Sequence, residues 1–330
     1  MAVTMAEITK LRHLTSAGLM DCKKALAETD GDIEAAVEIL RKKGQAVAAK
    51  REDREASEGC VLAKNVADFA AIVALKCETD FVAKNEGFVG LTHKILDAAM
   101  AAKAKSLDEV KALQLDGRAI SDLIVEESGK TGEKMELGAY EYVEAPSTTS
   151  YIHQGNKLAT IVGFNLPDVD YQTGRDIAMQ VASMNPVAVD RESVPQQVKD
   201  TEYNVAVDKT KEEQVKKAVE AALKKAGINP NLVDSEAHIE SNIAKGWLTT
   251  EEADKARVIA KETAEAKAAN LPEQMIKNIA QGRLNKFFKE SCLMEQEFVK
   301  DSSLTIGQYL EQSKKGLVAV EFKRVNLNED

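Results

Sequence analysis

The chain has 330 residues, enough for two or three compact units. Its 54 acidic and 44 basic residues give a formal charge of −10, which argues against a surface that coats nucleic acid through bulk electrostatics. The four scattered cysteines fit neither a zinc site nor a disulfide framework and indicate a reducing cytosol. No stretch is apolar enough for a signal peptide or a membrane span, so we expect a cytoplasmic, helix-rich protein without direct nucleic-acid binding.

Residues 1–56 carry the pattern of a small three-helix module followed by a linker. Apolar residues recur at helical spacing in three short segments, marked by Ile8, Leu11 and Leu14, by Cys22, Ala25 and Leu26, and by Ile33, Ala36, Val37 and Leu40. We expect Asp21 to cap the second helix and Gly44 to end the third. The pattern resembles the ubiquitin-associated type of three-helix fold, and the charged run at residues 45–57 is interpreted as a solvated linker.

The apolar pair Leu19 and Met20 follows Gly18 in the predicted loop between the first two helices. Such a pair belongs either to the core or to a contact surface, because a module this small buries few side chains. The residues alone leave both interpretations open.

Two later passages share one pattern, a predicted β-hairpin that leads into an amphipathic helix. They comprise strands 58–64 and 69–76 with a helix at about 82–102, and strands 150–153 and 158–165 with a helix at 175–183. In each passage the helix can cover one face of the sheet. The sequence therefore predicts an α+β core of two related subdomains, residues 57–145 and residues 146–192 with 290–330.

The stretch Thr79-Asp80-Phe81-Val82 lies at the strand-to-helix turn of the first passage. Thr79 can cap the first amides of the helix, and Asp80 suits the positive end of the helix dipole. Neither role explains Phe81, whose ring is either tucked under the turn or held out for a partner. The matching turn of the second passage has no Thr-Asp-Phe, so the fold unit does not need this aromatic residue, which favours a ring held out for a partner. Tyr171, which lies near that second turn, weakens the comparison.

A helix ended by Gly129 is expected between the two passages, followed by a strand at residues 135–144. We expect one face of this strand to carry Leu137, Ala139, Glu141 and Val143.

Residues 193–289 are predicted to form a helical insertion, because narrow apolar stripes run between Lys and Glu residues. Helices with such narrow stripes pair with one another, and the single tryptophan, Trp247, is interpreted as a packing anchor. A last strand at about 316–323 is expected to complete the second sheet.

The most specific segment of the chain is Lys76-Cys77-Glu78-Thr79-Asp80-Phe81-Val82-Ala83-Lys84-Asn85-Glu86-Gly87-Phe88, and further distinctive segments are residues 17–26, 151–155, 282–288 and 293–299. Together these segments resemble the bacterial elongation factor Ts family. The resemblance implies a helical coiled-coil excursion inside the second subdomain and guanine-nucleotide exchange on elongation factor Tu. It implies no cofactor, no metal and no catalytic residue for this chain, which also lacks a glycine-rich phosphate loop.

The resemblance also assigns site residues. Thr79, Asp80, Phe81 and Val82 would dislocate Mg²⁺ from the nucleotide site of elongation factor Tu, and Leu19, Met20 and His153 would be weaker partner contacts. The expected partner is elongation factor Tu, GDP-bound or nucleotide-free, and a homodimer through the insertion stays open.

Two other classes of function stay open beside the exchange factor. One is a ubiquitin-associated type adaptor that bridges proteins without exchange activity. The other is a thiol-dependent hydrolase that uses Cys77, which lies beside Lys76 and before a predicted helix.

Overall fold

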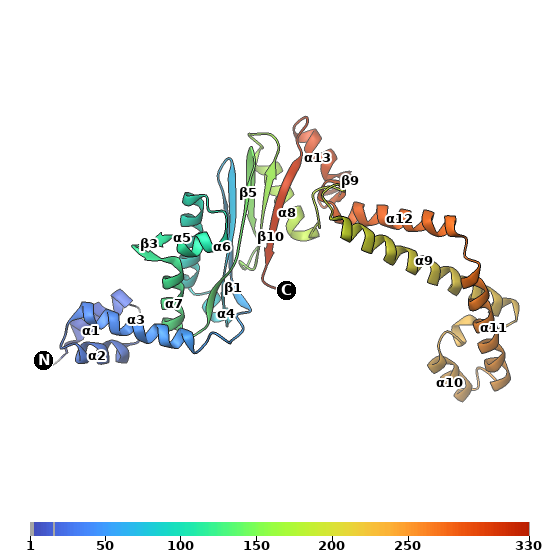
Figure 1. Cartoon of the computed structure of the whole chain (residues 1–330), viewed down its shortest axis with the longest axis horizontal. Helices are drawn as coiled ribbons and strands as arrows, with labels where there is room; N and C mark the ends of the chain where they lie inside the picture. Colours follow the sequence, from blue (N-terminus) through green and yellow to red (C-terminus); the bar gives the residue numbers. More distant parts are fainter. Residues whose placement is uncertain (1–2, 16, 330) are drawn as a thin grey trace. The chain divides into compact units, whose positions relative to one another are not determined.

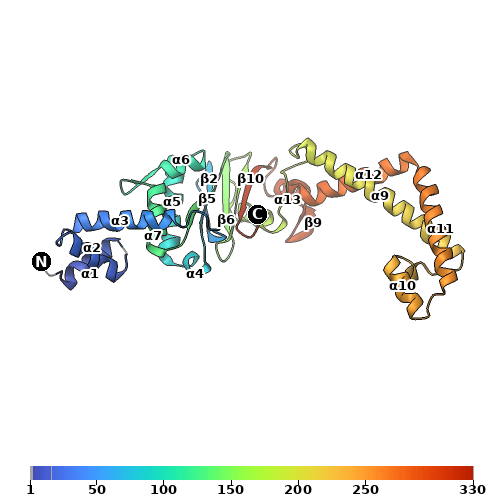
Figure 2. The same ribbon diagram turned by 60° about the horizontal axis from the view of Figure 1, so that its bottom comes forward.

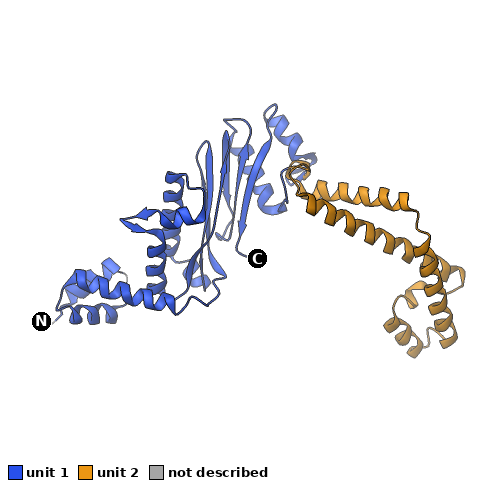
Figure 3. Cartoon of the chain, in the orientation of Figure 1, with its two compact units in different colours: residues 1–189, 297–330 blue, residues 190–296 orange. Residues whose placement is uncertain are grey.

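The computed structural model describes residues 3–15 and 17–329. These residues form two compact units, residues 1–189 with 297–330 and residues 190–296, which are coloured separately in Figure 3. The mixture of helices and strands confirms the predicted α+β class. The second unit contains residues 193–289, the stretch expected to form the helical insertion.

Three helices, α1 (Met5–Thr15), α2 (Leu19–Glu28) and α3 (Ile33–Ala49), form the N-terminal part of the first unit (Figure 1). We call this part the N-terminal module. Its core consists of Ile8, Leu11, Cys22, Ala25, Leu26 and Ala36. The start of α2 differs from the prediction, because the N-cap residue is Gly18 and Asp21 lies in the first turn. Leu19 and Met20 therefore lie on a helix and not in a loop.

Helix α3 does not end at Gly44, and helix α7 (Ile120–Thr131) does not end at Gly129. The two glycines meet where these helices cross. A Cβ atom on Gly129 would lie 2.2 Å from the Cα atom of Gly44, so a larger residue would force the helices apart. The prediction is wrong because both glycines permit close packing and neither ends its helix. The left-handed C-cap of α7 is Gly132, with a φ of 72°.

Strands β1 (Glu58–Asn65), β2 (Phe69–Cys77) and β5 (Met135–Glu144) form an antiparallel sheet in the order β1-β2-β5. Helix α5 (Glu86–Ala102) packs on one face of this sheet. Four short elements complete this part of the chain: α4 (Asp80–Ala83), α6 (Leu107–Ala112), β3 (Gln114–Leu115) and β4 (Arg118–Ala119). Strand β2 is buried on both faces, which agrees with its continuous apolar run.

The facing of β5 departs from the prediction at Gly138. The pairing with β2 shifts there, because Leu137 lies opposite Leu75 while Ala139 lies opposite Ala74. Leu137 consequently joins the core on the α5 face, and Ala139 packs on the other face. A β-bulge adds one residue to the strand and reverses the alternation of side chains, which explains the difference.

The second antiparallel sheet has the order β10-β7-β6 and consists of β6 (Ser147–Ile152), β7 (Leu158–Phe164) and β10 (Ala319–Asn326). Helix α8 (Tyr171–Met184) packs on it, and β8 (Glu297–Phe298), β9 (Asp301–Thr305) and α13 (Ile306–Ser313) precede β10. Buried residues of both sheets form one cluster: Val61, Ala63, Ala70, Ile72, Ala74, Val143, Ala159 and Ile161. Figures 1 and 2 show the strands with α5 on one side and α13 on the other.

The second unit consists of α9 (Gln196–Lys225), α10 (Glu236–Ala244), α11 (Thr250–Ala269), α12 (Glu273–Ser291) and the 3-10 turns η1 (Pro230–Leu232) and η2 (Leu293–Glu295). The long helix α9 packs against both α11 and α12. Trp247 is 64% exposed, so its interpretation as a packing anchor is wrong. Its neighbour Leu248 is the buried residue at this position, and Lys245 lies over the Trp247 ring, with Nζ 5.1 Å from its centre.

Candidate functional site

The Thr79–Val82 turn follows β2 and comprises the N-cap and the first three residues of α4. Thr79 is the N-cap of α4, and its hydroxyl accepts a hydrogen bond from the N–H of Val82 at 3.5 Å. Successive helical residues are about 100° apart, so Phe81 and Ala83 point to nearly opposite sides. Ala83 is buried and Val82 packs against the core, whereas Phe81 is 84% exposed. Of the two interpretations open from the sequence, the structure has Phe81 held out.

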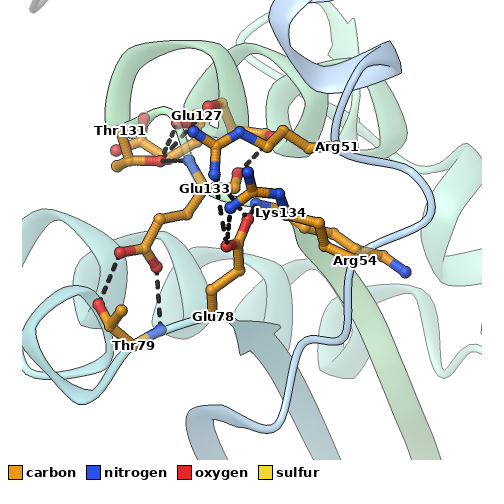
Figure 4. Close-up of polar contacts among 9 residues, drawn as sticks. Arg51, Arg54, Glu78, Thr79, Glu127, Thr131, Glu133 and Lys134 are labelled. Atoms are coloured by element: carbon orange, nitrogen blue, oxygen red, sulfur yellow. Dashed lines mark hydrogen bonds and ion pairs between the residues drawn. The ribbon is translucent and has the colours of Figure 1, made fainter.

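The carboxylate of Glu133, in the connection between α7 and β5, holds the Thr79 turn. Its Oε2 atom accepts the backbone N–H of Thr79 at 3.0 Å, and its Oε1 atom accepts the Thr79 hydroxyl at 2.6 Å (Figure 4). The hydroxyl of Thr79 therefore donates to Glu133 while it accepts from Val82. Hydrogen bonds to an ionised acceptor are the stronger kind, so this clamp fixes the start of α4.

Glu78, the residue before the clamp, is held by three other groups. The backbone N–H of Lys134 donates to Oε1 at 2.6 Å, and Nη1 atoms of Arg51 and Arg54 lie 3.2 and 3.1 Å from the carboxylate (Figure 4). The bond from Lys134, with Arg54 and Arg51, lowers the pKa of Glu78. The charged run after α3, interpreted from the sequence as a solvated linker, thus also forms ion pairs with Glu78 through these two arginines.

Asp80 opens α4 and forms an exposed ion pair with Lys84, whose Nζ lies 2.6 Å from Oδ2. This hydrogen bond lowers the pKa of Asp80, and the charge of Lys157 adds to the effect. Lys157 lies in the turn between β6 and β7. The N–H of Val61 in β1 donates to the carbonyl of Asn156 in the same turn at 2.7 Å. The second hairpin therefore ends close to α4.

His153 belongs to that same turn and is exposed. Its ring Nδ1 atom lies 2.9 Å from the hydroxyl of Tyr151, and its backbone N–H donates to the backbone carbonyl of Leu158 at 2.8 Å. The structure thus brings His153 and the Thr79–Val82 turn to one end of the core.

Leu19 and Met20 lie on another element, the first turn of α2, and are 41% and 70% exposed. The large apolar residues Met5 and Leu14 of the N-terminal module are exposed as well. The first unit therefore presents apolar side chains both on its N-terminal module and at α4, a feature that marks contact surfaces.

The arrangement offers little for covalent or metal chemistry. Within residues 3–15 and 17–329, no three His, Cys, Asp or Glu side chains are placed to hold a metal ion. All four cysteines are buried, and burial raises the pKa of Cys77 to about 12 and that of Cys60 to about 11. Cys77 is therefore a protonated thiol at neutral pH, and it donates to the carbonyl of Thr79 at 3.3 Å. A nucleophilic cysteine needs the opposite environment, so the hydrolase alternative loses its only candidate.

No helix in the described part of the chain is both long enough and apolar enough to cross a membrane.

Sequence reasoning missed Glu133, Arg51 and Arg54. Glu133 lies 54 residues from Thr79, and no local pattern links a glutamate after a helix to a threonine before another. Arg51 and Arg54 stand in a run of mixed charges, where surface pairing is the usual outcome. Only the fold brings these three residues to the turn.

The fold and the site define an α+β protein that presents an aromatic side chain on a fixed turn, a class of protein suited to recognising another macromolecule. The chain belongs to the elongation factor Ts family, because the model of the family described as "Elongation factor TS" matches residues 78–234 and 205–329. It is thus a translation elongation factor.

Curated relatives support this assignment over the whole length of the chain. The elongation factor Ts proteins of Parabacteroides distasonis and Phocaeicola vulgatus are 58% and 59% identical over 328 residues, which cover 99% of each chain. That of Porphyromonas gingivalis is 48% identical over 331 residues and covers 100% of both chains.

Proposed function

We propose that this chain binds elongation factor Tu in its GDP-bound form and promotes the exchange of GDP for GTP. The observation that carries the proposal is Phe81, which is 84% exposed on a turn whose preceding residues, Glu78 and Thr79, are both held in place. Aromatic side chains are usually buried, and covering this one in a partner would contribute roughly 2–3 kcal/mol. Membership of the elongation factor Ts family supports the identity of the partner.

Phe81 acts as an apolar wedge that enters the nucleotide-binding domain of elongation factor Tu. Asp80 supplies a carboxylate at the rim of the contact. Because Thr79 and Val82 already fix the turn, little conformational entropy is lost when the wedge enters. The resulting shift displaces the Mg²⁺ that the partner holds beside its nucleotide, and losing that charge loosens GDP.

Leu19, Met20 and His153 supply further contacts that hold elongation factor Tu while Phe81 acts. They lie on α2 and after β6, outside α4, so they bind without taking part in the displacement. Coupling between two ligands is reciprocal. If the chain weakens GDP binding by some factor, GDP must weaken the binding of the chain by the same factor.

The release of a fluorescent GDP analogue from elongation factor Tu tests the proposal. The stopped-flow rate should rise with the concentration of the chain and reach a plateau, and excess GDP should dissociate the complex. The alternative, a ubiquitin-associated type adaptor, would bind its partners whatever the GDP concentration. Binding without any acceleration of GDP release would refute the exchange function.

A further inference from the structure

We infer that Glu133 is a positioning residue for Phe81, because its two hydrogen bonds to Thr79 set the direction in which α4 presents the ring. This inference rests on the exchange function proposed above. Glu133 lies outside the Thr79–Val82 stretch and acts through Thr79, so it does not need to touch elongation factor Tu.

Helix α4 cannot fix this direction by itself. It is a single turn of four residues, and isolated turns are unstable because nucleating a helix is costly. On its inner side only Val82 and Ala83 reach the core, and Val82 is partly exposed. The orientation of so short an element depends on contacts from outside it, and the Glu133 carboxylate makes two of them.

Glu133 is itself anchored to the last turn of α7. Its N–H donates to the hydroxyl of Thr131 at 3.3 Å, and the hydroxyl of Ser128 donates to its carbonyl at 2.5 Å. Both backbone polar groups of Glu133 are therefore bound by side chains of α7. The carboxylate extends from a fixed backbone toward Thr79, as Figure 4 shows.

Helix α7 is a firm support for this clamp. It crosses α3 at Gly44 and Gly129, next to Ser128, with no side chain between the two backbones. Close-packed helices of this kind transmit displacement rather than absorb it. The clamp thus ties the Phe81 turn to the N-terminal module, where Leu19 and Met20 are exposed.

The test compares Glu133→Ala with a matched control in the second unit. Glu252 likewise accepts both donors of an N-cap threonine, here within one capping box, since its Oε2 accepts the Thr249 N–H at 2.9 Å and the Thr249 hydroxyl at 2.8 Å. Glu252→Ala therefore removes the same chemistry at a turn without Phe81. GDP release from elongation factor Tu is measured against the concentration of each variant, which separates the maximal rate from the half-saturating concentration.

For Glu133→Ala we expect the maximal rate to fall about tenfold, which corresponds to about 1.4 kcal/mol. The half-saturating concentration should change less than about threefold, because the contacts at Leu19, Met20 and His153 remain. Amide exchange at Thr79 should accelerate, since its N–H loses its acceptor. Glu252→Ala should match the wild-type chain in both parameters. The inference would be overturned if Glu133→Ala kept the wild-type maximal rate. It would also be overturned if Glu133→Ala and Glu252→Ala lost the same fraction of that rate.

Three further variants cover the case in which Glu133→Ala unfolds. Glu133→Gln keeps the side-chain volume and an acceptor for the Thr79 N–H, and its NH2 group can donate to the Thr79 hydroxyl, so both contacts can form without the charge. It should keep more of the maximal rate than Thr79→Val, which cannot form the hydroxyl bond, and a folded Thr79→Val chain with the wild-type maximal rate would overturn the inference. Thr79→Val should lose rate because it removes the hydroxyl bond to Glu133, and Thr79→Ser, which keeps the hydroxyl, should lose less.

A double-mutant cycle shows whether Glu133 acts through Thr79. Thr79→Val should cost less rate when Glu133→Ala is already present than it does in the wild-type chain, because both changes remove the bond between the Thr79 hydroxyl and the Glu133 carboxylate. Additive losses would contradict action through Thr79. If the wild-type chain itself fails to speed GDP release, the proposed function falls. If it succeeds and Glu133→Ala equals it, only the positioning role falls.

Discussion

One added methyl group should have opposite effects at the two glycines of the α3–α7 crossing. A Cβ atom on Gly129 would lie 2.2 Å from the Cα atom of Gly44 and 2.8 Å from its carbonyl carbon and oxygen. A Cβ atom on Gly44 would instead lie 3.5 Å from the Cα atom of Gly129, which is ordinary van der Waals contact. We therefore expect Gly129→Ala to destabilise the first unit and Gly44→Ala to be tolerated.

Two terms set the size of the difference. Alanine favours a helix interior over glycine by about 0.5–1 kcal/mol, and both substitutions gain this term. Overpacking against a backbone costs about 1–3 kcal/mol, and only Gly129→Ala incurs this cost. The two variants should differ by about 2 kcal/mol, which is about 4–8 °C in melting temperature for a unit of this size.

Thermal unfolding followed by far-UV circular dichroism measures the difference, and hydrogen exchange localises it to α3 and α7. Gly90→Ala in α5 is the control, because nothing lies within 4 Å of a Cβ atom built there. It should match Gly44→Ala. If Gly129→Ala has the same melting temperature as Gly44→Ala, the helices do not cross as closely as we describe and the reasoning is refuted.

Three further predictions concern the titratable groups. The thiols of Cys60 and Cys77 should resist alkylation in the folded chain at pH 7, because burial raises their pKa values to about 11 and about 12. Both thiols should react once urea unfolds the chain. Rapid alkylation of the folded chain would contradict their burial. Glu78→Gln should lower the free energy of unfolding at pH 7, because the folded chain favours the carboxylate form of Glu78 and so lowers its pKa. The stabilisation by this carboxylate is fully present above the pKa of the unfolded chain, about 4.3, and is lost as the pH falls through the lower pKa of the folded chain. Urea midpoints of the variant and the wild-type chain should therefore converge in acid, and a constant gap would argue against the Arg51–Arg54–Glu78 contacts. Lys84→Ala should raise the pKa of Asp80 toward its ordinary value in a carboxyl NMR titration, because the Lys84 hydrogen bond is the main cause that lowers it; no change would mean that the pair does not form in solution.

Local features of the fold were predictable from the sequence. Thr79 as the N-cap of α4 and the hairpin-to-helix pattern of each half depend on residues a few positions apart, which the sequence displays directly. The role of Gly44 and Gly129 in close helix packing was not predictable, because a glycine that ends a helix and a glycine at a helix crossing look alike in a single sequence. Their role is defined by a helix far away in the chain.

In the candidate site, too, local features were predictable from the sequence and long-range contacts were not. The sequence located Phe81 but left its direction open, because the exposure of a side chain is a property of the tertiary structure. The clamp on Thr79 comes from Glu133, which the chain places 54 residues later. Trp247 shows the converse error, since its size suggested packing whereas the structure buries Leu248 in its place.

The Phe81→Ala substitution tests the central claim most directly. The side chain is 84% exposed, so removing it should leave the melting temperature within about 2 °C of the wild-type value. In the complex with elongation factor Tu the loss of roughly 2–3 kcal/mol of burial corresponds to a decrease of about 30- to 150-fold. We predict this decrease in the stimulated rate of GDP release, measured by stopped flow with the folded variant. A folded Phe81→Ala chain that stimulates release as well as the wild-type chain would contradict the account.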